Sequence, residues 1–213
     1  MFIESNSKYW VAFLFLSMRT LCTTLLLFFF SVSTFATDTY KYDMFLLGSK
    51  IGTIVVTHEK RSDGSDYFIM TSDARAKILW TDRTSKTRCE VVFKDGKLVS
   101  SVHDKVENTS GQRICKVTSD KNGYKGSVNG KTFTVNETPT YSVSSLYVQE
   151  PKNVKRIFYE PDGTFADIKK IAPDAYEFKS SDGNRNVYRY KDGQITEMEF
   201  HLTFVSVTVK RAK

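Results

Sequence analysis

The sequence predicts an all-β fold: a single highly curved antiparallel meander sheet, as a barrel or half-barrel, with one short helix and an N-terminal signal peptide. Asp-Gly or Asn-Gly pairs recur between β-rich runs, and such pairs tolerate the positive φ angles of two-residue hairpin turns. Polar and apolar residues alternate with period two within the runs. The seven pairs stand at 63–64, 95–96, 122–123, 129–130, 162–163, 182–183 and 192–193.

Residues 1–36 are predicted to be a signal peptide that lies outside the fold. From Leu21 to Ala36 the chain reads LCTTLLLFFFSVSTFA, an apolar segment that ends in small residues. Met18-Arg19 directly before it is a well-formed start, and we interpret Met18 as the true initiator. The alternative is an uncleaved membrane anchor over 9–37, in which Arg19 would cost about 2.5–3.5 kcal/mol on insertion scales. We therefore expect an exported protein, periplasmic or secreted, or else one anchored in the membrane.

Residues 37–213 are expected to form one antiparallel β domain, since a chain of this length buries about 70% of its unfolded surface in one core. The formal net charge of the whole chain is +7. Outside the cytoplasm, this charge favours an anionic envelope surface over nucleic acid as a partner. The basic residues are spread over strands and turns, so an ordinary solvated surface accounts for them as well. No nucleic-acid partner is expected, and the oligomeric state stays open.

The first strands are expected at 40–47 and 50–61, joined through Gly48-Ser49. The clearest strand follows from Asp66 to Trp80, where small residues stand between bulky ones on one face. An opposing element must come close to that face, or a hollow remains beneath Ala74. The residues on this face are Phe68, Met70, Ser72, Ala74, Ala76, Ile78 and Trp80.

A hairpin around Asp95-Gly96 comes next, with apolar side chains of both strands on one face. The predicted register pairs Phe93 with Leu98, Val91 with Ser100, and Cys89 with Val102. Cys115 falls on the following strand, and strands two apart lie roughly 9–10 Å from each other, beyond the roughly 7 Å that a disulfide allows. We therefore predict that Cys89 and Cys115 are free, buried thiols without a disulfide.

The remaining elements include one helix. Val143, Leu146 and Tyr147 stand at i, i+3 and i+4 between Pro139 and Pro151, which predicts a helix of two or three turns. The last strand changes the parity of its apolar residues, which predicts a β-bulge near 204–205. The further strands are expected at 113–118, 124–128, 131–135, 155–160, 164–171, 175–179, 185–191 and 194–209.

No catalytic constellation is evident in the sequence. His58, His103 and His201 have no metal-ligand spacing, and serine-nucleophile and phosphate-loop motifs are missing. His103-Asp104 cannot form a catalytic pair, because adjacent residues on a strand point to opposite faces. We expect no enzyme, no metal and no cofactor, with an enzyme kept as the third hypothesis. The many tyrosines are interpreted as cross-strand structural contacts before ligand contacts.

Several segments resemble a known family. They are YKYDMFLLGSKIGTIVV at 40–56, SVSSLYVQEP at 142–151, KRIFYEPDGTF at 155–165 and YEFKSSDGNRNVYRYKDGQI at 176–195. Together they resemble the uncharacterised exported β-proteins of domain-of-unknown-function family 6134. The resemblance implies a fold and export, and lends no catalytic residue. The family is similar in look to exported half-barrels that hold lipid or acyl chains on a concave apolar face, an analogy of architecture alone.

Two function hypotheses follow from these observations. The first is a non-enzymatic exported protein that binds a lipid or other hydrophobic small molecule in an apolar cavity. The second is an envelope structural or interaction module, which uses a basic surface to contact anionic envelope components or a protein partner. The cavity is predicted to be lined by small and apolar residues of the central strands and the helix: Ser72, Ala74, Ala76, Ile78, Trp80, Val91, Ser100, Val102 and Leu146.

Overall fold

The computed structural model describes residues 37–78, 80–203 and 205–212. The predicted signal peptide, the Met18 start and the alternative anchor lie outside these residues. The first eight strands are β1 (Thr37–Leu46), β2 (Ser49–Lys60), β3 (Asp66–Ile78), β4 (Thr81–Lys94), β5 (Lys97–Glu107), β6 (Gly111–Asp120), β7 (Gly123–Val128) and β8 (Lys131–Val135). After helix α2 (Val143–Leu146) come β9 (Arg156–Tyr159), β10 (Thr164–Ala172), β11 (Ala175–Lys179), β12 (Arg185–Lys191), β13 (Gln194–His201) and β14 (Ser206–Arg211).

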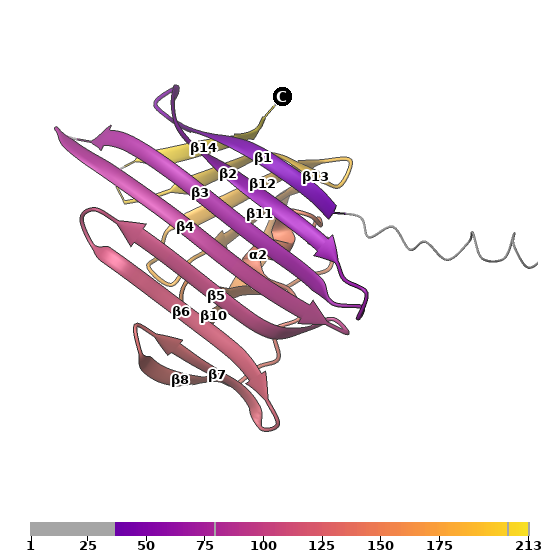
Figure 1. Ribbon diagram of the computed structural model, residues 1–213. Helices are drawn as coiled ribbons and strands as arrows, with labels where there is room; N and C mark the ends of the chain where they lie inside the picture. Colours follow the sequence, from indigo (N-terminus) through magenta and orange to yellow (C-terminus); the bar gives the residue numbers. More distant parts are fainter. Residues whose placement is uncertain (1–36, 79, 204, 213) are drawn as a thin grey trace, which may run out of the picture. The chain divides into compact units, whose positions relative to one another are not determined.

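All fourteen of these strands join one antiparallel sheet (Figure 1). Its order is β8-β7-β6-β5-β4-β3-β2-β1-β14-β13-β12-β11-β10-β9, so the first strand pairs with the last and the sheet ends at β8 and β9. Each Asx-Gly pair lies at a reversal between consecutive strands, as predicted. Asp95-Gly96, Asn129-Gly130 and Asp192-Gly193 have positive φ at both residues, as their two-residue turns require. The predicted antiparallel meander is confirmed.

The two edge strands of the sheet meet through side chains rather than through a ladder. Phe158 on β9 packs in a core cluster with residues of β3 to β8, which shows how far the sheet curls. A Cβ added to Gly163, in the β9–β10 turn, would lie 2.4 Å from Cζ of Phe133 on β8. Arg156 Nη1 also lies 2.5 Å from Glu137 Oε1. We call this contact between β8 and the β9–β10 hairpin the seam. The sheet is therefore a curved half-barrel without closure by hydrogen bonds.

Segment 136–155, which contains α2, connects the two edges of the sheet. The helix has four residues, shorter than the predicted two or three turns. Tyrosine hydroxyls hold the segment against the sheet: Tyr190 donates to the carbonyl of Leu146 at 2.9 Å, and Tyr176 donates to Glu150 at 2.8 Å. Packing and these hydrogen bonds replace a longer helix, so these tyrosines have the structural role that the sequence suggested. Among the described residues, no helix combines the length and the apolar character that crossing a bilayer needs.

Two register predictions are wrong. A bulge between Val92 and Phe93 keeps Phe93 opposite Leu98 but shifts every later pair by one, so that Cys89 faces His103. The predicted bulged strand at 194–209 is instead the hairpin β13–β14, whose reversal carries a hydrogen bond from the Leu202 amide to the Val205 carbonyl. A change in apolar parity can mark either a bulge or a tight turn, and no Asx-Gly pair signals this turn.

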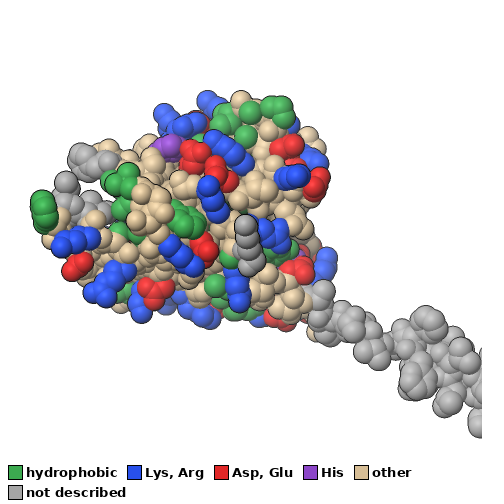
Figure 2. Space-filling model, turned by 90° about the horizontal axis from the view of Figure 1, so that it is seen from above, with side chains coloured by type: hydrophobic (Ala, Val, Ile, Leu, Met, Phe, Trp, Pro, Cys, Tyr) green, Lys and Arg blue, Asp and Glu red, His purple; other side chains and the backbone are tan. Residues whose placement is uncertain are grey.

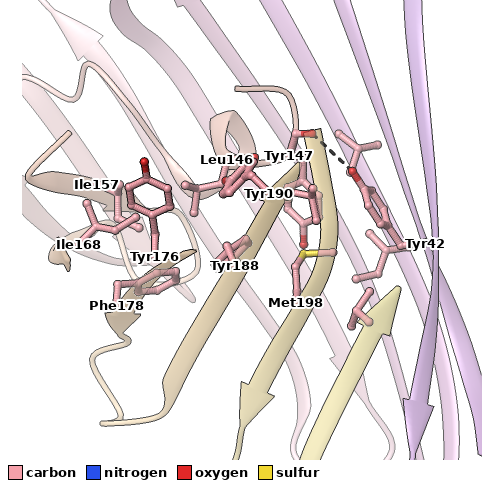
Figure 3. Packing of buried hydrophobic residues seen from close by; sticks show 14 of the residues in the cluster. Tyr42, Leu146, Tyr147, Ile157, Ile168, Tyr176, Phe178, Tyr188, Tyr190 and Met198 are labelled. Carbon is pink, nitrogen blue, oxygen red and sulfur yellow. Dashed lines mark hydrogen bonds between the residues drawn. The ribbon is translucent and has the colours of Figure 1, made fainter. Parts of the chain in front are cut away.

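The buried side chains form two clusters on the concave side of the sheet. The larger cluster joins α2 and the strands of both halves, and it contains several aromatic rings (Figure 3). Tyr147, directly after α2, meets Tyr42 and Tyr188 edge-on, with ring centroids 5.7 and 6.4 Å away. The smaller cluster lies over β3 to β8 and includes Cys89 and Cys115, both free and buried with β5 between them, as predicted. The two clusters fill part of the concavity, and a pocket remains in another part of it.

Candidate pocket

A pocket of about 680 Å³ remains inside the half-barrel. Most of its lining residues come from the strand ends next to the β1–β2, β3–β4, β5–β6, β11–β12 and β13–β14 turns. The antiparallel registers place all five turns at the same end of the sheet, which we call the turn end. In Figure 1 the β3–β4 turn marks this end on the left. The pocket therefore opens at one end of the sheet, opposite the strand end where Thr37 begins.

One wall of the pocket is apolar and lined by small side chains. Ser72, Ala74 and Ala76 of β3 lie on it, with Ile54 of β2 and Met70 beside them. The short side chains leave volume in front of the strand, which is the hollow that the sequence suggested beneath Ala74.

The position next to Ala74 is also constrained. Gly52 of β2 pairs with Ala74, and a Cβ at Gly52 would lie 2.2 Å from the carbonyl oxygen of Asp73. Glycine is needed there because the two backbones approach closely. The apolar wall is thus built by tight β2–β3 packing behind small residues.

A second wall is polar, and it begins on β4, the strand next to β3. Ser85 and Thr87 of β4, His103 of β5, and Asn184 and Asn186 near the start of β12 line it. These side chains supply hydroxyl, amide and imidazole groups, which can hydrogen-bond a ligand without carrying charge. Arg83, Lys105, Glu107 and Asp182 line the pocket as well. The pocket is therefore amphipathic, with an apolar wall on β2–β3 and a polar wall that also carries charged side chains.

His103 is the most unusual group in the polar wall. Its side chain is only 5% exposed, and its Nδ1 atom is buried without a hydrogen-bond partner among the described residues. Burial, and next the positive charge of Lys105, lowers its pKa from 6.5 to about 4. The imidazole is therefore neutral at pH 7. No carboxylate of the described chain hydrogen-bonds to it, so it lacks the orienting partner of a catalytic triad.

The cysteines flank His103 on the neighbouring strands. Cys89 and Cys115 are its cross-strand partners on β4 and β6. Burial raises the pKa of Cys115 to about 11 and raises the pKa of Cys89 as well, so both stay protonated thiols. No group of three or more His, Cys, Asp or Glu in the described chain has metal-binding geometry. This row thus connects the pocket, which His103 lines, to the smaller core cluster that contains the cysteines.

The floor of the pocket is aromatic and rests on α2. Tyr147 and Tyr188 line it, with Val143 of the helix. Behind the floor, the fully buried carboxylate of Glu160 accepts hydrogen bonds from the amides of Ser144, at 2.8 Å, and Val143, at 3.2 Å. Burial raises the pKa of Glu160, while the bond from Ser144 opposes the rise. The carboxylate orients the first turn of α2 and thereby the floor.

The structure bears differently on the individual residues of the predicted cavity. Ser72, Ala74 and Ala76 line the pocket, whereas the side chain of Ile78 lies outside the described part of the chain. Val91 and Leu146 are fully buried core residues that do not line it. Trp80 is 91% exposed in the β3–β4 turn, because β3 ends at Ile78 and the chain reverses there.

The bulge explains the error on β5, because its extra residue is Val99 of β5, which has no partner on β4. The predicted register placed Ser100 and Val102 inside, but the shift turns Val102 to the exposed outer face and leaves Ser100 off the pocket. Ser101 and His103 take the inward positions instead. The sequence alternation of β5 pointed the other way, because Leu98, Ser100 and Val102 share one parity. The polar wall was missed because it combines strands that are distant in sequence.

Comparisons with known proteins agree with this architecture. A family model described as "Domain of unknown function (DUF6134)" matches residues 42–212. Among solved structures, the chain is similar to a beta-barrel-like protein of domain of unknown function DUF1849 from Brucella abortus. The TM-score is 0.56 at 13% identity, over 82% of this chain and 95% of that one, which shows a shared fold alone. No curated protein matches this chain. None of these matches indicates an enzyme family.

Proposed function

Since the chain belongs to the DUF6134 family, whose description states no activity, we propose a function from its pocket: a non-enzymatic exported protein that binds a lipid-like hydrophobic ligand. The observation that carries the proposal is the open pocket of about 680 Å³ in front of the small residues of β3. This volume lies within the range of about 300–1,000 Å³ that is usual for small-molecule sites.

The apolar wall can supply the binding energy. Burying about 300 Å² of an acyl chain at roughly 25 cal/mol per Å² contributes about 7 kcal/mol before the entropic cost of binding. Ser72, Ala74 and Ala76 leave room for such a chain, and the aromatic floor at Tyr147 and Tyr188 extends its contact surface.

The polar wall then determines which part of the ligand lies against it. A chain that lies along β2 and β3 would present its other side or its head group to β4, β5 and β12. The neutral His103 can accept or donate a hydrogen bond there, as can the serine, threonine and asparagine side chains. We expect an amphipathic ligand with a polar head group that can form hydrogen bonds with this wall.

Export belongs to the proposal as an expectation from the sequence. The apolar segment at 21–36 ends in small residues as cleaved signal peptides do, and the alternative is an anchor that keeps the domain at the membrane. Native mass spectrometry of protein purified from its host would report the mature amino terminus and a co-purified ligand together. An unprocessed chain isolated with cytoplasmic proteins would overturn the proposal of export.

The test of binding uses delipidated protein and a fluorescent fatty-acid probe. The wild type should take up the probe with an affinity that changes little with ionic strength. Ala74→Trp, which fills the space in front of β3, should weaken binding at least about tenfold, a loss of about 1.4 kcal/mol. The matched control is Ala172→Trp, at the exposed end of β10. No saturable uptake by the wild type, or equal uptake by both variants, would refute the pocket as the binding site.

The second candidate function is an envelope interaction module. It is favoured by basic side chains on the outer face of the sheet, such as Arg75 and Lys77, which alternate with the inward small residues of β3. Association through this face should weaken as salt rises, because exposed charges are screened within about 10 Å at 0.1 M salt. Salt-sensitive association without probe uptake would favour this module over the ligand-binding protein.

A further inference from the structure

Three turns at the turn end expose large apolar side chains. Leu47 in the β1–β2 turn is 94% exposed, Trp80 in the β3–β4 turn is 91% exposed, and Leu202 in the β13–β14 turn is 46% exposed. We call these three residues the apolar rim. Single exposed apolar residues are common on proteins, but a group of them at one end of a sheet marks an interaction surface.

The three turns are neighbours in the sheet. The strand order β4-β3-β2-β1-β14-β13 makes them three consecutive hairpins. Leu46 pairs with Ser49 on one side and with Val207 on the other, so the β1–β2 and β13–β14 turns lie next to each other. Gly52 pairs with Ala74, which places the β3–β4 turn at the same end. The rim is therefore carried by three neighbouring hairpins, although its residues are far apart in sequence.

The backbone conformation of Leu47 and Trp80 indicates that these residues do not stabilise the fold. Leu47 has φ 49° and Trp80 has φ 70°, in the left-handed region that costs a non-glycine residue roughly 1–2 kcal/mol. The other four described non-glycine residues with positive φ are all Asp or Asn, which tolerate this region. A leucine and a tryptophan thus occupy strained turn positions while burying almost nothing in the fold.

The rim lies at the mouth of the pocket, on the side of the apolar wall. Leu46, next to Leu47, and Ala76, close to Trp80, both line the pocket, and Leu202 lines it directly. A ligand chain that leaves the apolar wall through the mouth would therefore pass the rim. This continuity connects the exposed apolar side chains to the proposed ligand.

The charge near the rim is positive. Next to the β3–β4 turn, the arms of the hairpin carry Arg75, Lys77 and Arg83 against one carboxylate, Asp82, so the net charge there is positive. None of the three basic side chains forms an ion pair with a described residue. Figure 2 shows hydrophobic side chains together with Lys and Arg side chains, and Asp or Glu side chains between them, at the left end of the molecule, the end that carries the β3–β4 turn in Figure 1. Apolar and basic groups together suit the headgroup region of an anionic bilayer, where tryptophan is favoured.

We propose that the apolar rim docks on the surface of an anionic lipid bilayer, with the rim residues in the boundary between headgroups and acyl chains. The pocket mouth then faces the lipids, which would be the source or the destination of the ligand. This inference rests on the proposed function, because ligand binding gives the docking its purpose. The contact of the rim with the bilayer is tested separately from ligand binding. Each buried apolar rim side chain adds transfer energy, and the basic arms add attraction that salt screens.

The test uses tryptophan fluorescence in the full chain. The sequence has two tryptophans, so Trp10→Phe leaves Trp80 as the reporter. On vesicles of phosphatidylglycerol and phosphatidylethanolamine, Trp80 emission should shift to the blue, and lipids brominated near the headgroup should quench it. Vesicles of phosphatidylcholine alone, or high salt, should reduce both effects. A solvent-like, unquenched Trp80 on vesicle-bound protein would overturn the proposal and point to a protein partner.

A second reporter controls for adsorption without orientation. Ile171 is 45% exposed at the end of β10, at the opposite end of the sheet from the rim. With Trp10→Phe and Trp80→Phe, the variant Ile171→Trp should stay unquenched. Equal quenching of both reporters would also overturn the proposal. If the protein took up no probe in the absence of vesicles, the proposed ligand binding would be refuted but the proposed membrane docking would not. The two failures can therefore be told apart.

Discussion

His103 should make the folded protein sensitive to mild acid. The imidazole is 5% exposed, and burial holds its pKa at about 4 against 6.5 for an unperturbed histidine. The unfolded chain therefore binds a proton between pH 6.5 and pH 4 that the folded chain does not, and stability falls as pH falls through this window. The full difference is about 3 kcal/mol, and the part lost between pH 7.5 and pH 5.0 is about 2 kcal/mol.

Urea unfolding at pH 7.5 and pH 5.0 measures this difference, with His103→Gln as the comparison. The glutamine variant cannot titrate, so its stability should fall by about 2 kcal/mol less than that of the wild type over this interval. His201→Gln, on the surface of the β13–β14 hairpin, keeps the imidazole of His103 and should retain the acid-sensitive loss. Wild type and His103→Gln with the same pH dependence would refute the burial of a neutral imidazole in this wall.

Two further predictions concern the seam and the connecting segment. Gly163→Ala should lose about 1–3 kcal/mol more of unfolding free energy than Gly193→Ala, because both have positive φ but only the first meets Phe133. Equal losses in urea would mean that the seam is open in solution. Tyr190→Phe should lose about 1–3 kcal/mol, since it leaves the last carbonyl of α2 buried without its donor. Tyr124→Phe is its control, and a thermal shift no larger than the control's would contradict that bond.

Much of the fold is local in origin, which is why it could be predicted. Asx-Gly pairs specify reversals through backbone conformation, and alternation over 66–78 specifies a half-buried strand from its own residues. Predictions failed where one sequence pattern is compatible with more than one structure. The bulge at Val92 leaves no mark in composition, and it reversed the faces of Ser100 and Val102. The β13–β14 turn lacks an Asx-Gly pair and was taken as a bulge.

The candidate site could be predicted only on one side. The small residues of β3 signal a hollow because they alternate along one strand, and Ser72, Ala74 and Ala76 do line the pocket. The polar wall joins β4, β5 and β12, and no local pattern relates residues that lie about a hundred positions apart. The rim was missed for the same reason, and Trp80 was placed inside because its parity was counted past the end of the strand.

The amino-acid sequence by itself determined the class of fold, the places where the chain reverses, and the strand whose small side chains leave space. These properties depend on φ preferences and side-chain alternation within a few residues. Only the tertiary structure decided that the first and last strands pair, that the edges meet at a side-chain seam, and that three turns with exposed apolar residues lie together on one side of the pocket mouth. Those features depend on how a twisted sheet of many strands curls in space, and its curvature is the sum of small registers and bulges along the whole chain.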